Sequence, residues 1–146
     1  IILFIAEKTA KFNKKIEDVG VKEAIVVGIA QAFALIPGSS RSGTTITGGL
    51  FMGLNREAAA RFSFLLSIPA IFASGILQLK EGLQFLSNEH LLAILVATIV
   101  SGISGYLAID FLLKFLRKNS TTLFIVYRIA AGIIILALLF SNQITP

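Results

Sequence analysis

The residues best suited to chemistry lie between two apolar segments, in the run Pro37-Gly38-Ser39-Ser40-Arg41-Ser42-Gly43-Thr44-Thr45. This run combines five hydroxyl side chains with one guanidinium and two glycines. Glycine lets the backbone turn and approach a ligand closely, and a guanidinium matches two oxygens of a phosphate at once. Free N–H groups at the start of a following helix, with the positive end of its dipole, favour the same kind of ligand. The run therefore predicts a site for a phosphate-like anion.

Two other interpretations of this run are weaker. The hydroxyls could simply cap a helix while Arg41 extends to the membrane interface, but a cap needs one hydroxyl and not five around an arginine. The spacing from Gly38 to Gly43 also matches the glycines of a nucleotide P-loop. However, Thr44 stands where that motif requires lysine, and apolar helices rather than a strand and a helix flank the run. We therefore reject the P-loop.

The composition places this run in a membrane protein. Hydrophobic residues make up 55% of the 146 residues and charged residues only 14%, whereas a soluble domain carries roughly 25% charged residues. There is no cysteine and one histidine, which excludes a disulfide scaffold, a thiol nucleophile and a transition-metal centre. The net charge of +5 comes from Lys and Arg residues that lie between apolar runs. This pattern indicates contact with anionic lipid and not with nucleic acid.

Three apolar segments are long enough to cross a bilayer, which takes ~20 residues. We predict transmembrane helices over 58–79, 91–113 and 121–140. Pro69 in the first of them is tolerated as a kink. The third contains a single charge, Arg128, and a charge within a span is a candidate functional residue. For Arg128 we favour extension to the interface or an ion pair with Asp110 over a contact with substrate.

Residues 21–54 show a different pattern. The apolar arms Ala24–Ile36 and Ile46–Leu54 are too short to cross ~30 Å of hydrocarbon at 1.5 Å per residue. Irregular backbone at membrane depth persists only where it lines a cavity or is buried in protein. We therefore predict a re-entrant helix-loop-helix hairpin with the polar run at its tip. The predicted fold is an all-α, polytopic membrane protein with one membrane domain over 1–146.

The distribution of charge predicts how the chain lies in the membrane. Lys and Arg concentrate in 7–20, 54–61 and 114–119, which the positive-inside rule places on the cytoplasmic side. Residues 80–90 and the C-terminus then lie outside, and the hairpin enters and leaves from the cytoplasmic side. We expect Arg56, at the hairpin's exit, to be an interfacial charge that lysine could replace.

The stretch Gly28–Thr45, GIAQAFALIPGSSRSGTT, resembles the second signature of the bacterial undecaprenyl-diphosphatase family, the bacitracin-resistance membrane phosphatases. Its pattern P-G-x-S-R-S-G-x-T is matched at every fixed position, and the similarity continues to Tyr127-Arg128 in the last span. The resemblance implies a multi-pass enzyme of the bacterial inner membrane, built from two inverted repeats. Such an enzyme hydrolyses undecaprenyl diphosphate to undecaprenyl phosphate, recycling the lipid carrier for peptidoglycan synthesis and conferring bacitracin resistance.

The resemblance also implies roles for residues of the polar run. Arg41 would hold the diphosphate, with Ser40 and Thr45 as its catalytic neighbours. The implied substrate-binding residues are Gly38, Ser39, Ser42, Gly43 and Thr44. The family depends on a divalent cation, Mg²⁺ or Ca²⁺, whose glutamate-rich signature belongs to the first repeat. The eight carboxylates here show no such spacing, so no metal ligand is assigned to this chain.

Because Ile1 stands within an apolar run, we expect the chain to be the C-terminal half of a longer protein. Its implied partners are the lipid substrate, the membrane and the N-terminal repeat, and a homodimer is left open. The alternative function is half of a transporter or flippase that binds a lipid phosphate without hydrolysis. Inverted repeats whose helix N-termini point at an anionic substrate are also transporter architecture.

Overall fold

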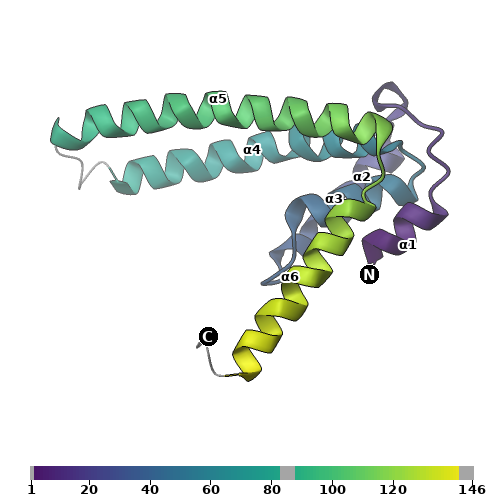
Figure 1. The fold of residues 1–146 in the computed structure, drawn as a ribbon. Coiled ribbons are helices and arrows are strands. Elements are labelled where there is room, and N and C mark those ends of the chain that lie inside the picture. Colours follow the sequence, from purple (N-terminus) through teal and green to yellow (C-terminus); the bar gives the residue numbers. More distant parts are fainter. Residues whose placement is uncertain (1, 83–87, 142–146) are drawn as a thin grey trace.

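The computed structural model describes residues 2–82 and 88–141, in which all the regular elements are helical (Figure 1). The elements, in chain order, are α1 (Ile2–Thr9), the 3₁₀ turn η1 (Ile16–Asp18), α2 (Val21–Ala32), the 3₁₀ turn η2 (Phe33–Leu35), α3 (Arg41–Phe51), α4 (Arg56–Gly82), α5 (Asn88–Lys118) and α6 (Thr122–Phe140). The predicted all-α class is confirmed for this part of the chain.

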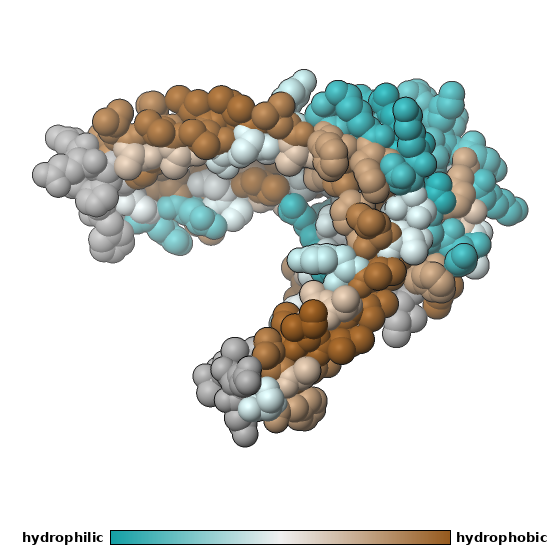
Figure 2. Space-filling model, viewed as in Figure 1, coloured by the Kyte–Doolittle hydropathy of each residue, from teal (hydrophilic) through white to brown (hydrophobic). Residues whose placement is uncertain are grey.

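The three predicted spans correspond to the three longest helices. Within the described residues, α4, α5 from Leu91 and α6 are each long and apolar enough to cross a membrane. Helix α4 continues through Pro69, as expected for a membrane helix. Most of the apolar side chains on these helices are exposed (Figure 2). Such surfaces are stable only against lipid or against further protein.

The long helices form two arms that diverge from a common junction (Figure 1). Helices α4 and α5 lie side by side and run in opposite directions as the first arm. Helix α6 leaves the junction in another direction as the second arm. The short helices α1, α2 and α3 lie near the junction, where α3 contacts α1, α2 and α4. The hairpin is therefore held at the angle between the two arms.

Small residues let the short helices approach one another closely. A Cβ atom added at Gly48 of α3 would lie only 2.8 Å from the Cβ atom of Ala30 on α2. One added at Gly49 would lie 3.0 Å from the Cβ atom of Ala59 on α4. Close backbone contact through small residues is how helices associate without a hydrophobic driving force. The orientation of α3 between α2 and α4 therefore depends on these glycines.

The hairpin has the predicted form, with different helix ends. Helices α2 and α3 have 12 and 11 residues, so each is about 16–18 Å long at 1.5 Å per residue. The first arm ends at Ala32 and continues as η2, because Pro37 forces Ile36 into extended backbone. The second begins at Arg41 and not at Ile46, because Ser40 caps it. The re-entrant placement of this pair in the membrane stays a prediction.

The three basic segments come together at the junction. The backbone of Lys14 pairs with that of the α3–α4 connection, through Lys14 N to Gly53 O at 3.0 Å and Asn55 N to Lys14 O at 2.8 Å. Arg117 of α5 forms an ion pair with Glu57 of α4 at 2.7 Å. Hydrophilic residues accordingly gather at this end of the molecule (Figure 2). This clustering is what the predicted orientation requires.

We expect Gly48→Ala to destabilise the full-length protein by about 1–3 kcal/mol, the usual cost of overpacking a close contact. The matched control is Gly28→Ala on α2, where an added Cβ atom meets nothing within 4 Å. Thermal unfolding in detergent would compare the two variants. Equal stability of both would show that the α2–α3 contact does not depend on Gly48.

Cysteine labelling tests the re-entrant placement. A cysteine at Ser39, on the hairpin tip, should react slowly with a membrane-impermeant maleimide added to either side of sealed vesicles. A control cysteine at Asn119, an exposed position in the α5–α6 connection, should react rapidly from one side. Rapid labelling of the Ser39 position from the bulk would contradict the re-entrant placement.

Candidate anion-binding site

The tip of the hairpin presents the N-terminus of α3. Gly38 has a φ of +83°, which glycine adopts at little cost, and it turns the chain toward α3. Ser40 then caps the helix, since its Oγ accepts a hydrogen bond from Gly43 N at 3.2 Å. The N–H groups of Arg41 and Ser42 lie in the first turn, where a helix provides no acceptor of its own. These free donors and the helix dipole favour an anion at the tip.

The hydroxyl groups of the polar run divide into two sets. Thr44 and Thr45 each donate to the carbonyl oxygen of Arg41 at 2.9 Å, a common arrangement for threonine within a helix. Thr45 is 1% exposed, and its hydroxyl also contacts that of Ser63 on α4. Thr45 therefore links α3 to α4, and its predicted catalytic role stays a prediction.

The second set of hydroxyls remains at the tip. Ser39 and Ser42 are exposed, and Ser40 is half-buried. The Oγ atoms of Ser40 and Ser42 lie 3.4 Å apart, close enough for one hydroxyl to donate to the other. Ser40, predicted to be catalytic, and Ser42, predicted to bind substrate, are thus brought together at the start of α3.

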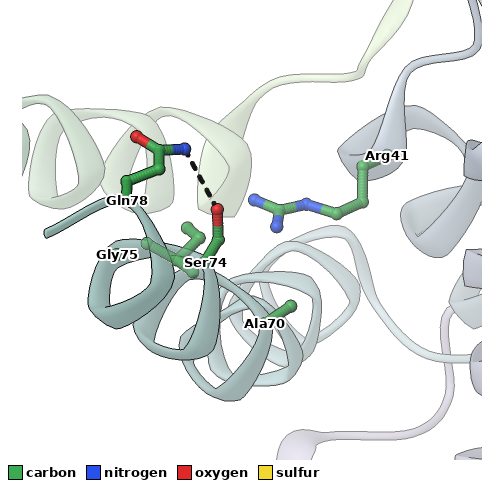
Figure 3. A pocket seen from close by; sticks show the side chains of 6 residues that line it. Arg41, Ala70, Ser74, Gly75 and Gln78 are labelled. Atoms are coloured by element: carbon green, nitrogen blue, oxygen red, sulfur yellow. Dashed lines mark hydrogen bonds between the residues drawn. The ribbon is translucent and has the colours of Figure 1, made fainter. Parts of the chain in front are cut away.

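Arg41 lies beside a cavity between the hairpin tip and α4. Figure 3 shows its guanidinium extending from the start of α3 toward Ser74. The cavity has a volume of about 280 Å³ and is lined by Arg41, Ala70, Ile71, Ser74, Gly75 and Gln78. Small side chains on α4 leave this space open, and the Gln78 amide donates to Ser74 Oγ at 3.2 Å. Because no carboxylate lines the cavity, the charge of Arg41 is available to an anion there.

A second guanidinium reaches the same helix end from α6. A Cβ atom added at Gly43 would lie 3.4 Å from Nη1 of Arg128 and 3.2 Å from Oγ of Ser40. The expected ion pair between Arg128 and Asp110 is wrong, because Asp110 pairs with Lys114 one turn along α5, at 2.6 Å. Sequence reasoning singled out Arg128 as an intramembrane charge but favoured other roles for it. The structure places it at the tip.

Neither guanidinium is neutralised within the part of the chain that the structure describes. Among residues 2–82 and 91–141, neither Arg41 nor Arg128 forms an ion pair. A charge at membrane depth costs several kcal/mol unless it has a partner or reaches water. Two arginines, a helix N-terminus and three serines therefore form a cationic, donor-rich site. Such a site fits a phosphate or diphosphate group.

The same donors do not fit a divalent cation. Mg²⁺ and Ca²⁺ take carboxylate, carbonyl and water oxygens, whereas the tip offers guanidinium, N–H and hydroxyl groups. In the described part of the chain, no group of three or more His, Asp or Glu side chains is arranged to hold a metal. A cation at this site would need ligands from outside these residues.

The fold defines a polytopic helical membrane protein, and the hairpin tip is its candidate binding site for a phosphate-like anion. The chain matches the family model described as bacitracin resistance protein BacA over residues 1–134. It therefore belongs to this family.

Curated relatives carry the name undecaprenyl-diphosphatase. The protein of Syntrophobacter fumaroxidans is 52% identical over 144 residues, covering 99% of this chain and 51% of the relative. That of Prosthecochloris aestuarii is 56% identical over 153 residues, covering 99% and 54%. That of Chloroherpeton thalassium is 59% identical over 125 residues, covering 84% and 44%. The chain thus spans about half the length of these relatives.

Ser40 allows capping to be separated from anion binding. Ser40→Ala should destabilise the full-length protein by about 1 kcal/mol, because it removes the cap. Ser40→Asp should keep the cap, since aspartate is an equally good N-cap residue. Its carboxylate would, however, occupy the guanidinium groups and repel an anion.

Thermal unfolding in detergent, with and without inorganic diphosphate, would measure both effects. Diphosphate should stabilise the wild type and Ser40→Ala but not Ser40→Asp. Asn119→Asp, which adds the same charge at the α5–α6 connection, should keep the stabilisation. If diphosphate stabilised Ser40→Asp as much as the wild type, the tip would not be the anion site.

Proposed function

We propose that the full-length protein hydrolyses undecaprenyl diphosphate to undecaprenyl phosphate and phosphate. In this proposal the chain supplies the part of the active site that binds the diphosphate. The observation that carries it is that Arg41 begins α3 and Arg128 lies beside Gly43 in the same first turn, while neither is paired with a carboxylate in the described residues. The name undecaprenyl-diphosphatase, which the curated relatives carry, supports this choice of substrate.

The residues at the tip are suited to the reaction's charge changes. Water would attack the terminal phosphorus, and the bond from that phosphorus to the bridging oxygen would break with its electron pair going to undecaprenyl phosphate. Arg41 can bind two oxygens of one phosphate in a bidentate manner, and Arg128 is close enough to the helix end to hold the other. Fixed donors aimed at developing charge lower the barrier without reorganisation. The groups that activate water are expected outside this chain.

A divalent cation, Mg²⁺ or Ca²⁺, belongs to the proposal with ligands from the part of the relatives that this chain does not cover. When bound, it would neutralise phosphate charge and orient the reacting groups. The remaining partners proposed are the N-terminal repeat and the lipid bilayer, with a homodimer left open. The proposed location is the bacterial inner membrane, where hydrolysis would recycle the carrier for peptidoglycan synthesis and confer bacitracin resistance.

Phosphate release from undecaprenyl diphosphate by the full-length protein in detergent tests the proposal. We expect turnover that a chelator abolishes and that added Mg²⁺ or Ca²⁺ restores. Binding of the lipid diphosphate without phosphate release under any cation would favour the transporter or flippase alternative.

Arg41→Lys tests the role of the guanidinium. The variant keeps a positive charge but replaces a planar fork with a point charge, so we expect kcat to fall by ~10²–10³, the usual effect of losing one such electrostatic contact. Arg41→Ala should lose more, because it also removes the charge that balances the phosphates. Arg61→Lys, at an exposed position near the junction, is the matched control and should retain wild-type turnover. Wild-type kcat in Arg41→Lys would show that Arg41 contributes only its positive charge and not the geometry of its guanidinium.

A further inference from the structure

A buried carboxylate, Glu7 of α1, joins three helices at the junction. Its side chain is 4% exposed. Oε1 accepts a hydrogen bond from Nε of Arg56 at 2.6 Å, and Oε2 accepts one from Oγ1 of Thr121 at 2.8 Å. Arg56 is the first residue of α4, and Thr121 directly precedes α6. One carboxylate therefore links α1 to the starts of both arms.

Helix α6 has few other attachments. Among the described elements, the backbone of α6 lies close to that of α1 only. The ring of Phe124 packs edge-on against that of Phe115 on α5, with centroids 5.8 Å apart, and Ile125 is buried. Beyond this first turn, most of the large apolar side chains of α6 are exposed. The contacts at its N-terminal end therefore determine where α6 lies.

The same end determines where Arg128 lies. Arg128 follows Thr121 by seven residues, which is two helical turns, or about 10 Å along the axis. At 3.6 residues per turn, positions i and i+7 lie on nearly the same face. A hydrogen bond that fixes Thr121 against Glu7 thus fixes both the rotation and the height of Arg128 beside Gly43.

We propose that Glu7, Arg56 and Thr121 are positioning residues that hold Arg128 at the anion site. This inference rests on the proposed function, because it assigns them to a site whose activity is itself proposed. Stability alone does not explain the buried ion pair between Glu7 and Arg56, because replacing such a pair by apolar side chains often leaves the free energy of unfolding unchanged or raises it. The geometry of the cluster offers another explanation, because the hydrogen bond from Thr121 to Glu7 fixes the position of α6 relative to α1.

This cluster corrects the expectation that Arg56 is an interchangeable interfacial charge. Both Nε and Nη2 of Arg56 contact Oε1 of Glu7. Its guanidinium also lies over the ring of Phe12, 4.1 Å from the centroid. Lysine has neither the planar fork nor the stacking surface. We therefore expect Arg56→Lys to loosen the cluster rather than to be silent.

Thr121→Val tests the proposal, since it removes the hydroxyl and keeps the shape of the side chain. We expect kcat for undecaprenyl diphosphate in the full-length protein to fall about tenfold or more, because small misplacement of a positioned group is costly. Thr121→Ser should restore it. The matched control is Thr122→Val in the same turn, because the side chain of Thr122 makes no hydrogen bond within the described residues. This control should retain wild-type kcat with the same thermal stability.

A double-mutant cycle distinguishes positioning from general damage. If Thr121 acts through Arg128, then Thr121→Val should cost nothing further in an Arg128→Ala background. The inference would be overturned if the fall in kcat of the double variant equalled the product of the falls in the two single variants. Wild-type kcat in Thr121→Val would also overturn it. If Thr121→Val does not fold, Glu7→Gln, which retains shape and one acceptor oxygen, takes its place in the cycle under the same criteria. Absence of phosphate release by the wild-type protein would show that the proposed function has failed, whereas wild-type turnover in both Arg41→Ala and Arg128→Ala would show that the tip is not the diphosphate site.

Discussion

The cost of an unneutralised guanidinium in a membrane protein is the constraint on which the rest of the structure depends. Arg41 begins α3, and Nη1 of Arg128 lies beside Gly43 in the same first turn, with no carboxylate paired to either in the described chain. That arrangement is stable only with an anion or water at the tip. The short helices, the glycine contacts of α3 and the turn at Gly38 all bring the tip to this position. The packing of the junction therefore places the two arginines where an anion or water can reach them.

Several charged side chains elsewhere in the described chain, unlike those at the tip, form ion pairs. At the junction, Glu7 pairs with Arg56, Glu23 with Lys14 and Glu57 with Arg117. Each of these pairs connects separate segments of the chain, so opposite charges serve to hold elements together. The tip has the same kinds of cation and none of the carboxylates. Arginine alone therefore does not indicate a ligand site. The arginines of the structural network are paired with carboxylates, whereas those at the tip are not paired within the described residues.

The sequence predicts those features that depend on neighbouring residues. The length of an apolar run sets the span of a helix, and a cluster of hydroxyls, glycines and Arg41 indicates an anion site wherever the fold places it. Contacts between distant segments are not accessible in this way. Arg56 meets Glu7 across 49 residues, and Thr121 meets Glu7 across 114. The position of Arg128 at Gly43, the burial of Thr45 against Ser63 and the role of Arg56 all depend on such contacts, because each side chain had several partners compatible with its local sequence.

Strong binding of a diphosphate raises the question of how the site would release its ligand. In the proposed site, two guanidinium groups and a helix N-terminus would attract a diphosphate through several charge-assisted hydrogen bonds at once. A flippase must release that same lipid unchanged, so every one of these contacts would oppose its turnover. For the proposed hydrolysis the difficulty is smaller, because cleavage separates the two phosphates and each product retains only part of the contacts. Binding energy that would trap a transported lipid can instead be used in the transition state, when charge on the separating phosphates is greatest. The unpaired arginines at the tip therefore suit a site that consumes its ligand better than one that passes it on.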